Sequence, residues 1–191
     1  MISRTALLLA LGLAAALGAG CSTASLEQRQ RWVANAASYM ERNVDATLHK
    51  LWHIVPGSRA MTDAAAGVLV FPRVLRGSFV VGAAHGKGAL RERGRTTGYY
   101  STTAGSVGMQ AGGQSRAVIY VFNSPQALAQ FKASRGWTAG ADATVAAGNV
   151  GANGVLDTTS SHPAVTSFVL TNAGLEAGAA VGAARIAPTQ P

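Results

Sequence analysis

The chain has 191 residues with sixteen Lys and Arg against eight Asp and Glu, a formal net charge of +8. This excess of positive charge indicates an anionic partner. A single cysteine excludes an internal disulfide, so a core of apolar side chains must hold the fold together.

The first residues predict an export signal. Arg4 precedes an uncharged apolar run from Ala6 to Leu17, which is shorter than the roughly 20 residues that a membrane-spanning helix needs. Small residues then lead to Cys21, and the sequence L-G-A-G-C that ends there resembles a lipobox, although Gly18 replaces the usual Leu or Val. We therefore predict a signal peptide at residues 1–20 and a diacylglycerol on the Cys21 thiol. Cleavage without lipidation is the alternative.

The residue after the cysteine bears on localisation. Ser22 occupies the position where lipoproteins of the inner membrane carry Asp. We therefore expect a lipid-anchored protein of the bacterial outer membrane that faces the periplasm, with residues 21–25 as the lipidated N-terminus and a short tether. Covalent acyl chains on Cys21 and the phospholipid membrane are its expected partners. Anionic phospholipid is the polyanion available there, and nucleic acid is not expected as a partner.

The next part of the chain predicts helices. Apolar residues recur from Leu26 to Val55 at the spacing of one helix face, which predicts one long amphipathic helix that ends before Pro56-Gly57. A short helix from Ser58 to Ala66 follows. Trp32 and Trp52 lie on the long helix and are candidates for the head-group level of a membrane. Anchoring in a protein core is the commoner role of such residues.

Beyond Gly67 the chain changes to short β-rich runs separated by glycine. The predicted strands cover residues 68–71, 78–81, 117–122, 164–170 and 175–186, and Ser124-Pro125 predicts the start of a helix. Glycine within strands indicates bulges or bends. We expect an α+β fold in which N-terminal amphipathic helices pack on a glycine-rich, curled antiparallel sheet that can approach a barrel. One domain over residues 26–187 and a tail at 188–191 complete the expected organisation.

Several blocks in this β region, taken in order, resemble the SYLF domain family of lipid-binding domains. The blocks are AGVLVFP (66–72), GSFVVG (77–82), GKGAL (86–90), SVGMQAG (106–112) and SFVLTNAGLEAG (167–178). Family members typically carry Trp-Ser after the third block, where this chain has Tyr100-Ser101. The resemblance runs from about Asn35 to Ile186. It implies phospholipid binding, often to acidic or phosphoinositide head groups, by a basic surface near the N-terminus, and no enzyme activity.

The positive charge is concentrated in one segment. Residues 67–100 have six basic side chains against Glu92 alone, a net charge of +5. We take these six as candidate lipid-binding residues: Arg73, Arg76, Lys87, Arg91, Arg93 and Arg95. If residues 89–95 are extended, Arg91, Arg93 and Arg95 share one face and form a row of guanidinium groups suited to phosphate oxygens. A solubilising edge strand is the alternative.

Patterns of catalysis and metal binding are incomplete. His49 and His53 are one helical turn apart but lack the Glu of a His-Glu-x-x-His motif, and Gly86-Lys87-Gly88 lacks the Ser or Thr of a phosphate loop. Ser161 and His162 are adjacent, so they cannot face one another as nucleophile and base. We predict a lipoprotein that binds phospholipid, without enzyme activity, metal or cofactor. The alternative is a structural or stress-response envelope protein that binds a protein or peptidoglycan partner through its basic surface.

Overall fold

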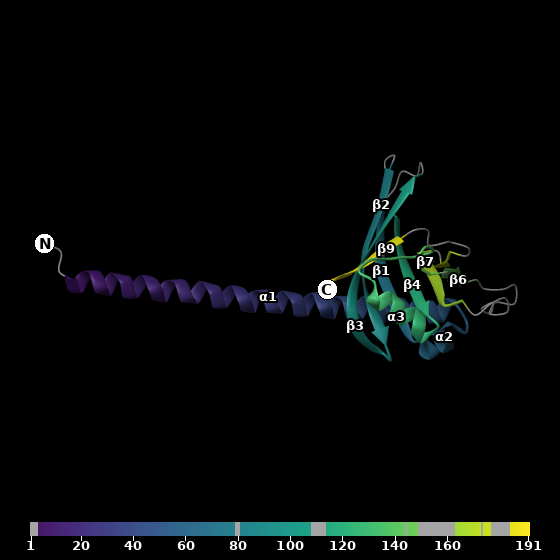
Figure 1. Cartoon of the computed structure of the whole chain (residues 1–191), viewed down its shortest axis with the longest axis horizontal. Helices are drawn as coiled ribbons and strands as arrows, with labels where there is room; N and C mark the ends of the chain where they lie inside the picture. Colours follow the sequence, from purple (N-terminus) through teal and green to yellow (C-terminus); the bar gives the residue numbers. More distant parts are fainter. Residues whose placement is uncertain are drawn as a thin grey trace. The chain divides into compact units, whose positions relative to one another are not determined.

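The computed structural model describes residues 4–78, 81–107, 114–143, 145–148, 163–172, 174–176 and 184–191 (Figure 1). The chain divides into two compact units, Met1–Tyr39 and Met40–Pro191. The first unit is the N-terminal part of helix α1 (Arg4–Ile54). The second contains the rest of α1 and every other helix and strand.

The helices agree with the predicted ones. Helix α1 covers the predicted amphipathic helix and also the segment predicted to be the signal peptide. Helix α2 (Ser58–Ala64) follows after Gly57, whose φ of 85° lies in the left-handed region that favours glycine. Helix α3 (Pro125–Ala133) begins as predicted, because the Ser124 side chain accepts a hydrogen bond from the Ala127 N–H.

The strands form one sheet that curls strongly into a half-barrel. Its order is β5-β9-β3-β2-β1-β4-β7-β6, and β8 pairs with β7. The strands are β1 (Gly67–Ser78), β2 (Val81–Glu92), β3 (Arg95–Val107), β4 (Gln114–Phe122), β5 (Trp137–Thr138), β6 (Val145–Ala147), β7 (Val165–Thr171), β8 (Gly174–Leu175) and β9 (Ala184–Thr189). The α+β prediction is confirmed. Among the described strands only the β6–β7 pair is parallel, which makes the sheet mixed rather than purely antiparallel.

Two of the predicted strands differ from the observed ones. Residues 78–81 are not one strand, because Ser78 ends β1, Val81 begins β2, and Ser78 pairs antiparallel with Gly82. Residues 79–80 lie outside the described part. The predicted run 175–186 includes the end of β8 and the start of β9, with residues 177–183 outside the description. Strand β9 continues to Thr189, so the first half of the expected tail pairs with β3.

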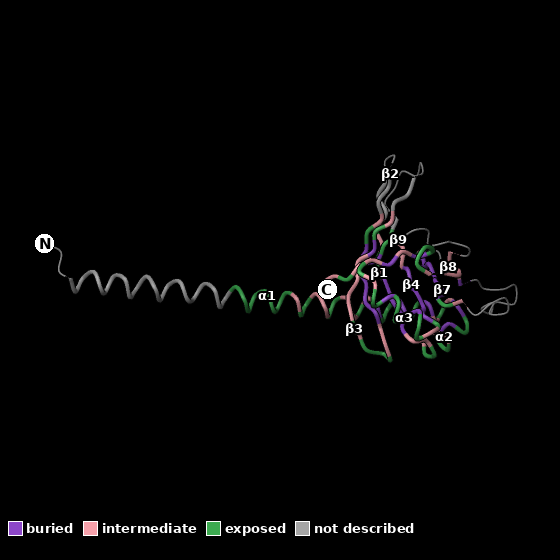
Figure 2. The backbone as a smooth tube through the Cα atoms, in the orientation of Figure 1, coloured by how far each residue is buried: buried purple, intermediate pink, exposed green. Residues whose placement is uncertain are grey.

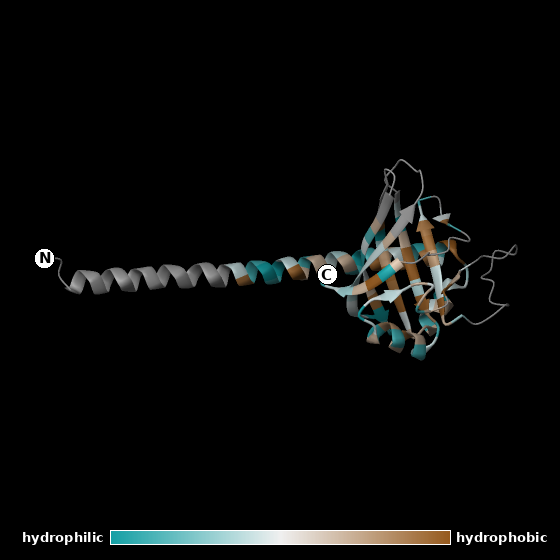
Figure 3. Cartoon of the chain, turned by 45° about the horizontal axis from the view of Figure 1, so that its top comes forward, coloured by the Kyte–Doolittle hydropathy of each residue, from teal (hydrophilic) through white to brown (hydrophobic). Residues whose placement is uncertain are grey.

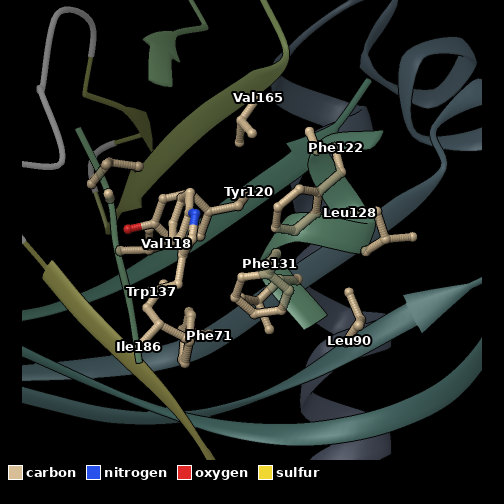
Figure 4. Close-up of a cluster of buried hydrophobic side chains, with 14 residues drawn as sticks. Phe71, Leu90, Val118, Tyr120, Phe122, Leu128, Phe131, Trp137, Val165 and Ile186 are labelled. Carbon is tan, nitrogen blue, oxygen red and sulfur yellow. The ribbon is translucent and has the colours of Figure 1, made fainter. Parts of the chain in front are cut away.

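The two faces of the sheet carry separate apolar clusters, which buries the central strands on both sides. These strands are largely buried in Figure 2 and largely hydrophobic in Figure 3. On one face, named the α1 face, Val68 and Val70 of β1 pack with Val44 and Leu51 of α1. On the other, named the α3 face, Phe71 packs with aromatic residues of β4, α3 and β5 (Figure 4). Alternate residues of β1 therefore point to opposite clusters.

Trp137 is an anchor of the α3 face. It is 2% exposed, and its ring lies 5.7 Å from that of Tyr120 and 5.6 Å from that of Phe131, edge to face in both cases. Tyr120 is almost fully buried, and this burial raises the pKa of its hydroxyl. The α3 face is thus a packed aromatic core. Helix α1, by contrast, covers only part of the α1 face.

Candidate anion-binding surface

A bulge in β1 decides which face Arg73 occupies. Val70 pairs with Ala89, but Arg73 pairs with Lys87, so β1 has one more residue than β2 between these pairs. Pro72 lies in this interval, and proline within a sheet is typical of bulges because it has no N–H to donate. A shift of one residue moves the following side chains to the opposite face. Arg73 therefore lies on the α1 face, whereas regular alternation from Phe71 would place it on the α3 face.

Arg73 and Lys87 form a cross-strand pair of exposed cations. Lys87 alternates with Ala89, which packs in the cluster under α1, so both cations lie on the α1 face. In the part of the chain that the structure describes, neither side chain is paired with an Asp or Glu. The Lys87 Nζ donates to the backbone oxygens of Gln190 and Pro191 at 3.2 and 3.3 Å. We name these two residues the Arg73–Lys87 pair.

The neighbours of the pair on the same face are polar or apolar, not acidic. Leu75 is 57% exposed and pairs with His85 on β2 and with Ser115 on β4. His85 is exposed and pairs with Thr103 on β3, which is also exposed. The pair therefore lies on an open sheet surface that carries positive charge, the imidazole of His85, the hydroxyl groups of Ser101, Thr103 and Ser115, and one apolar side chain.

The predicted row of guanidinium groups does not form. Strand β2 ends at Glu92 and β3 begins at Arg95. Arg93 and Gly94 between them have φ values of 50° and 75°, so the chain reverses there instead of remaining extended. The prediction that Arg91, Arg93 and Arg95 share one face was wrong, because a tight turn interrupts the alternation on which it depended.

The Arg91 side chain forms ion pairs with helix α1. Its side chain is 15% exposed, and its Nη2 lies 2.8 Å from Glu41 Oε2 and 2.7 Å from Asp45 Oδ1. The hydroxyl groups of Thr96 and Tyr99 donate to the other Glu41 oxygen at 2.7 and 3.3 Å. Burial, followed by the charge of Glu41, raises the pKa of Tyr99. This cluster joins the β2–β3 turn to α1, so Arg91 is not available to a ligand.

The remaining cations of the segment lie apart from the pair. Arg93 and Arg95 are exposed at the β2–β3 turn, roughly 20 Å along β2 from Lys87 at the usual rise of a strand. Glu92 beside them accepts hydrogen bonds from Lys132 at 2.8 Å and Thr97 at 2.6 Å. The Lys132 bond in particular holds the pKa of Glu92 below its ordinary value. Arg76 pairs with Ala84, and its side chain lies outside the described residues.

The glycines on either side of Lys87 have a packing role. A Cβ on Gly88 would lie 2.3 Å from the Val70 backbone oxygen, and one on Gly86 would lie 2.8 Å from the Arg73 oxygen. Because the backbone of β1 lies so close on either side of Lys87, no side chain fits at these two positions. The Gly-Lys-Gly sequence is therefore part of a paired strand, not a phosphate-binding loop.

The interfacial candidates occupy different environments. Trp52 is half-buried against the α1-face cluster, and its indole N–H donates to the Thr62 hydroxyl of α2 at 2.9 Å, with Arg59 5.1 Å from its ring. Trp52 therefore links α1 to α2 through these contacts. Trp32, in the first unit, is 65% exposed. Cys21 falls within α1, and its side chain lies outside the described residues.

Within the described residues, no three His, Cys, Asp or Glu side chains are grouped so that they could hold a metal ion. Nor is any helix in that part of the chain both long and apolar enough to cross a membrane. Ser161 and His162 lie outside the described residues.

The fold defines this chain as an α+β half-barrel with helices against both faces of its sheet. Residues 103–190, from β3 to the end of β9, match the family model Ysc84, described as Las17-binding protein actin regulator. This match supports the resemblance to the SYLF domain family over these residues, and with it a lipid-binding or actin-regulator-like class of domain. The match covers less than half of the chain and does not include the Arg73–Lys87 pair. Comparison with curated proteins found no match.

Proposed function

We propose that this protein is a membrane-anchored lipoprotein whose SYLF domain binds anionic phospholipid without catalysis. The observation that carries the proposal is the Arg73–Lys87 pair, which places two exposed cations side by side on an open sheet surface. Neither is paired with an Asp or Glu among the described residues, and the contacts of Lys87 there are with the oxygens of Gln190 and Pro191. Arg91 differs, because Glu41 and Asp45 already neutralise it.

The sizes of the binding free energies distinguish the role of the acyl chains on Cys21 from that of the basic surface. Burial of acyl chains contributes about 0.8 kcal/mol per CH₂, so the chains on Cys21 hold the protein to its membrane without further help. A basic residue near an anionic membrane contributes about 1 kcal/mol. The pair therefore orients the domain, selects lipids or contacts a second membrane surface. The family description concerns actin regulation, but a lipoprotein exported to the periplasm does not meet cytoplasmic actin, so we propose lipid as its ligand.

The anchor is tested by labelling. Palmitate fed to cells is expected to label the wild-type chain and not the Cys21→Ser variant, because this thiol is the only one in the chain. The variant should be exported yet not held by the membrane. Globomycin, which blocks lipoprotein processing, should cause the wild-type precursor to accumulate. Absence of label on the wild-type chain would rule out the lipid anchor.

The surface is tested by co-sedimentation of the domain without its lipid-bearing residue, residues 22–191, with phospholipid vesicles. We expect binding that increases with anionic lipid content and weakens steeply as salt is added, since exposed charges are screened over about 8 Å at physiological ionic strength. Neutral phosphatidylcholine vesicles are the control. Binding that does not respond to salt would indicate that the lipid site is an apolar surface, and the helix that carries Trp32 would be the next candidate. No vesicle binding by the folded chain would favour a protein or peptidoglycan partner.

A further inference from the structure

We propose that the outer edge of β3 at Arg95–Gly98 is a docking site for an acidic segment of a protein partner, which adds to the sheet as an extended strand. This inference goes beyond the proposed function, because it concerns a protein ligand at a separate place on the domain. Lys87 lies roughly 20 Å from this end of β2 at the usual rise of a strand, so a ligand at one surface does not block the other.

The edge is open because β9 covers only part of β3. The pairing of β9 with β3 runs from Ala104 to Tyr99, and Thr189 is its last paired residue on β9. The segment Arg95–Gly98 pairs with β2 on one side and with no described strand on the other. Beyond Thr189 the chain leaves the sheet, and its carbonyl groups accept hydrogen bonds from Lys87. Unpaired N–H and C=O groups along an edge are a template for a further strand.

The edge is held in position by both neighbouring helices. Arg91 is ion-paired with α1, and its Nη1 donates to the Gly94 oxygen of the turn at 3.1 Å. On the side of α3, Lys132 Nζ lies 2.8 Å from Glu92 Oε1. A segment that is fixed before binding loses little conformational freedom when a ligand docks. These contacts therefore prepare the start of β3 to receive a strand.

The charge around this edge is mostly positive. Arg93 and Arg95 are exposed, and neither forms an ion pair within the part of the chain that the structure describes. Glu92 is the only carboxylate between residues 91 and 98, and Lys132 neutralises it. Arg135, which is also exposed, follows shortly after Lys132 at the end of α3. Charge complementarity therefore favours a strand that carries carboxylate side chains.

The same charges exclude other occupants. A second copy of this edge would bring Arg93 and Arg95 against like charges, and charged, bulged edges such as this one, with its bulge at Thr97, prevent a sheet from pairing with itself. A lipid head group neutralises arginine but has no row of N–H and C=O groups to match those of β3. An extended acidic segment matches both features, because strand addition takes its affinity from main-chain hydrogen bonds and its specificity from side chains.

The experiment measures binding of a fluorescent peptide that alternates Glu and Val. The full chain carries Cys21→Ser so that no acyl chain is attached, and fluorescence anisotropy reports binding. We expect saturable binding that weakens as salt is added. Arg93→Gln combined with Arg95→Gln should raise the Kd about tenfold, which corresponds to about 1.4 kcal/mol. Circular dichroism melting establishes that the variant is folded. Absence of saturable binding to the folded chain would overturn the inference.

A modified peptide separates strand addition from simple attraction of charge. N-methylation at alternate residues keeps the carboxylates but removes main-chain donors, so this peptide should bind at least about fivefold more weakly. Hydrogen exchange at the amides of Arg95–Gly98 should become slower when the unmodified peptide binds. Equal affinity for the two peptides, or unchanged exchange at these amides, would show that no strand is added.

The matched control removes the same charge from the other basic surface. Arg73→Gln combined with Lys87→Gln should leave the Kd for the peptide within about twofold, since exposed charges are screened over a shorter distance than the one between the two surfaces. Equal weakening in both double variants would overturn the inference, because total charge would then explain the binding. Loss of acidic vesicle binding, and not of peptide binding, in the Arg93 and Arg95 variant would assign this edge to a membrane instead. Peptide binding by a chain that binds no vesicles would contradict the proposed function and support this inference.

Discussion

Gly88→Ala is expected to lower the free energy of unfolding by about 3 kcal/mol, at the upper end of the usual cost of overpacking a core. The new Cβ would lie 2.3 Å from the backbone oxygen of Val70 and 2.6 Å from Phe71 Cδ1. A backbone atom within a paired strand cannot turn aside, so β1 and β2 would have to separate. Denaturant unfolding of the variant and the wild type measures the difference.

The matched control is Gly98→Ala in β3. Its Cβ would lie 3.1 Å from Tyr100 Cε2, a ring atom at the edge of a half-buried side chain that can move by a few tenths of an ångström. We expect a loss of less than about 1 kcal/mol there. Similar losses in both variants would mean that the close approach of β1 and β2 is not what requires glycine at position 88.

Arg91→Glu is expected to destabilise the protein by about 2 to 4 kcal/mol. The substitution removes two short ion pairs, at 2.8 and 2.7 Å, and brings a third carboxylate toward Glu41 and Asp45. Loss of one partner of a buried ion pair costs about 3 to 5 kcal/mol, and the partial exposure of Asp45 lowers this value. The unfolding midpoint in denaturant should fall accordingly.

The control reverses charge at the exposed turn beside it. The double change Arg93→Glu and Arg95→Glu should alter stability by no more than about 0.5 kcal/mol at each position, because neither side chain is buried. If the double variant lost as much stability as Arg91→Glu, total charge rather than the contact with α1 would account for the effect. Reversing all three arginines together is therefore a poor test of a binding surface, since one of them holds the fold.

The sequence located the positive charge but not its arrangement. The excess in residues 67–100 was visible from counting, and Arg73 and Lys87 were among the candidates. Two local breaks in strand alternation determined which of these cations share a face. The turn at Arg93–Gly94 separated the three arginines, and the bulge near Pro72 turned Arg73 to the side of Lys87. Pro72 within an apolar strand was the available signal of that bulge.

The ion-pair partners of Arg91 could not be predicted from a local sequence pattern. Glu41 and Asp45 are one helical turn apart on α1, and Arg91 follows them by about fifty positions in the chain. Their spacing indicates that both carboxylates lie on one side of the helix. Which cation they meet depends on how α1 lies across the sheet, and this is decided by the packing of Val44 and Leu51 against β1.

By itself the sequence determined the features that depend on neighbouring residues: the long helix, the capped start of α3, the β-rich character after Gly67, the α+β class and the resemblance to the SYLF family. Helix periodicity, capping and turn chemistry are local, so a few residues suffice to predict them. The tertiary structure alone decided the strand order, the parallel β6–β7 pair and the separation of Arg91 from the Arg73–Lys87 pair. These depend on hydrogen bonds and burial between segments far apart in the chain, and a bulge of one residue reverses which face each side chain occupies.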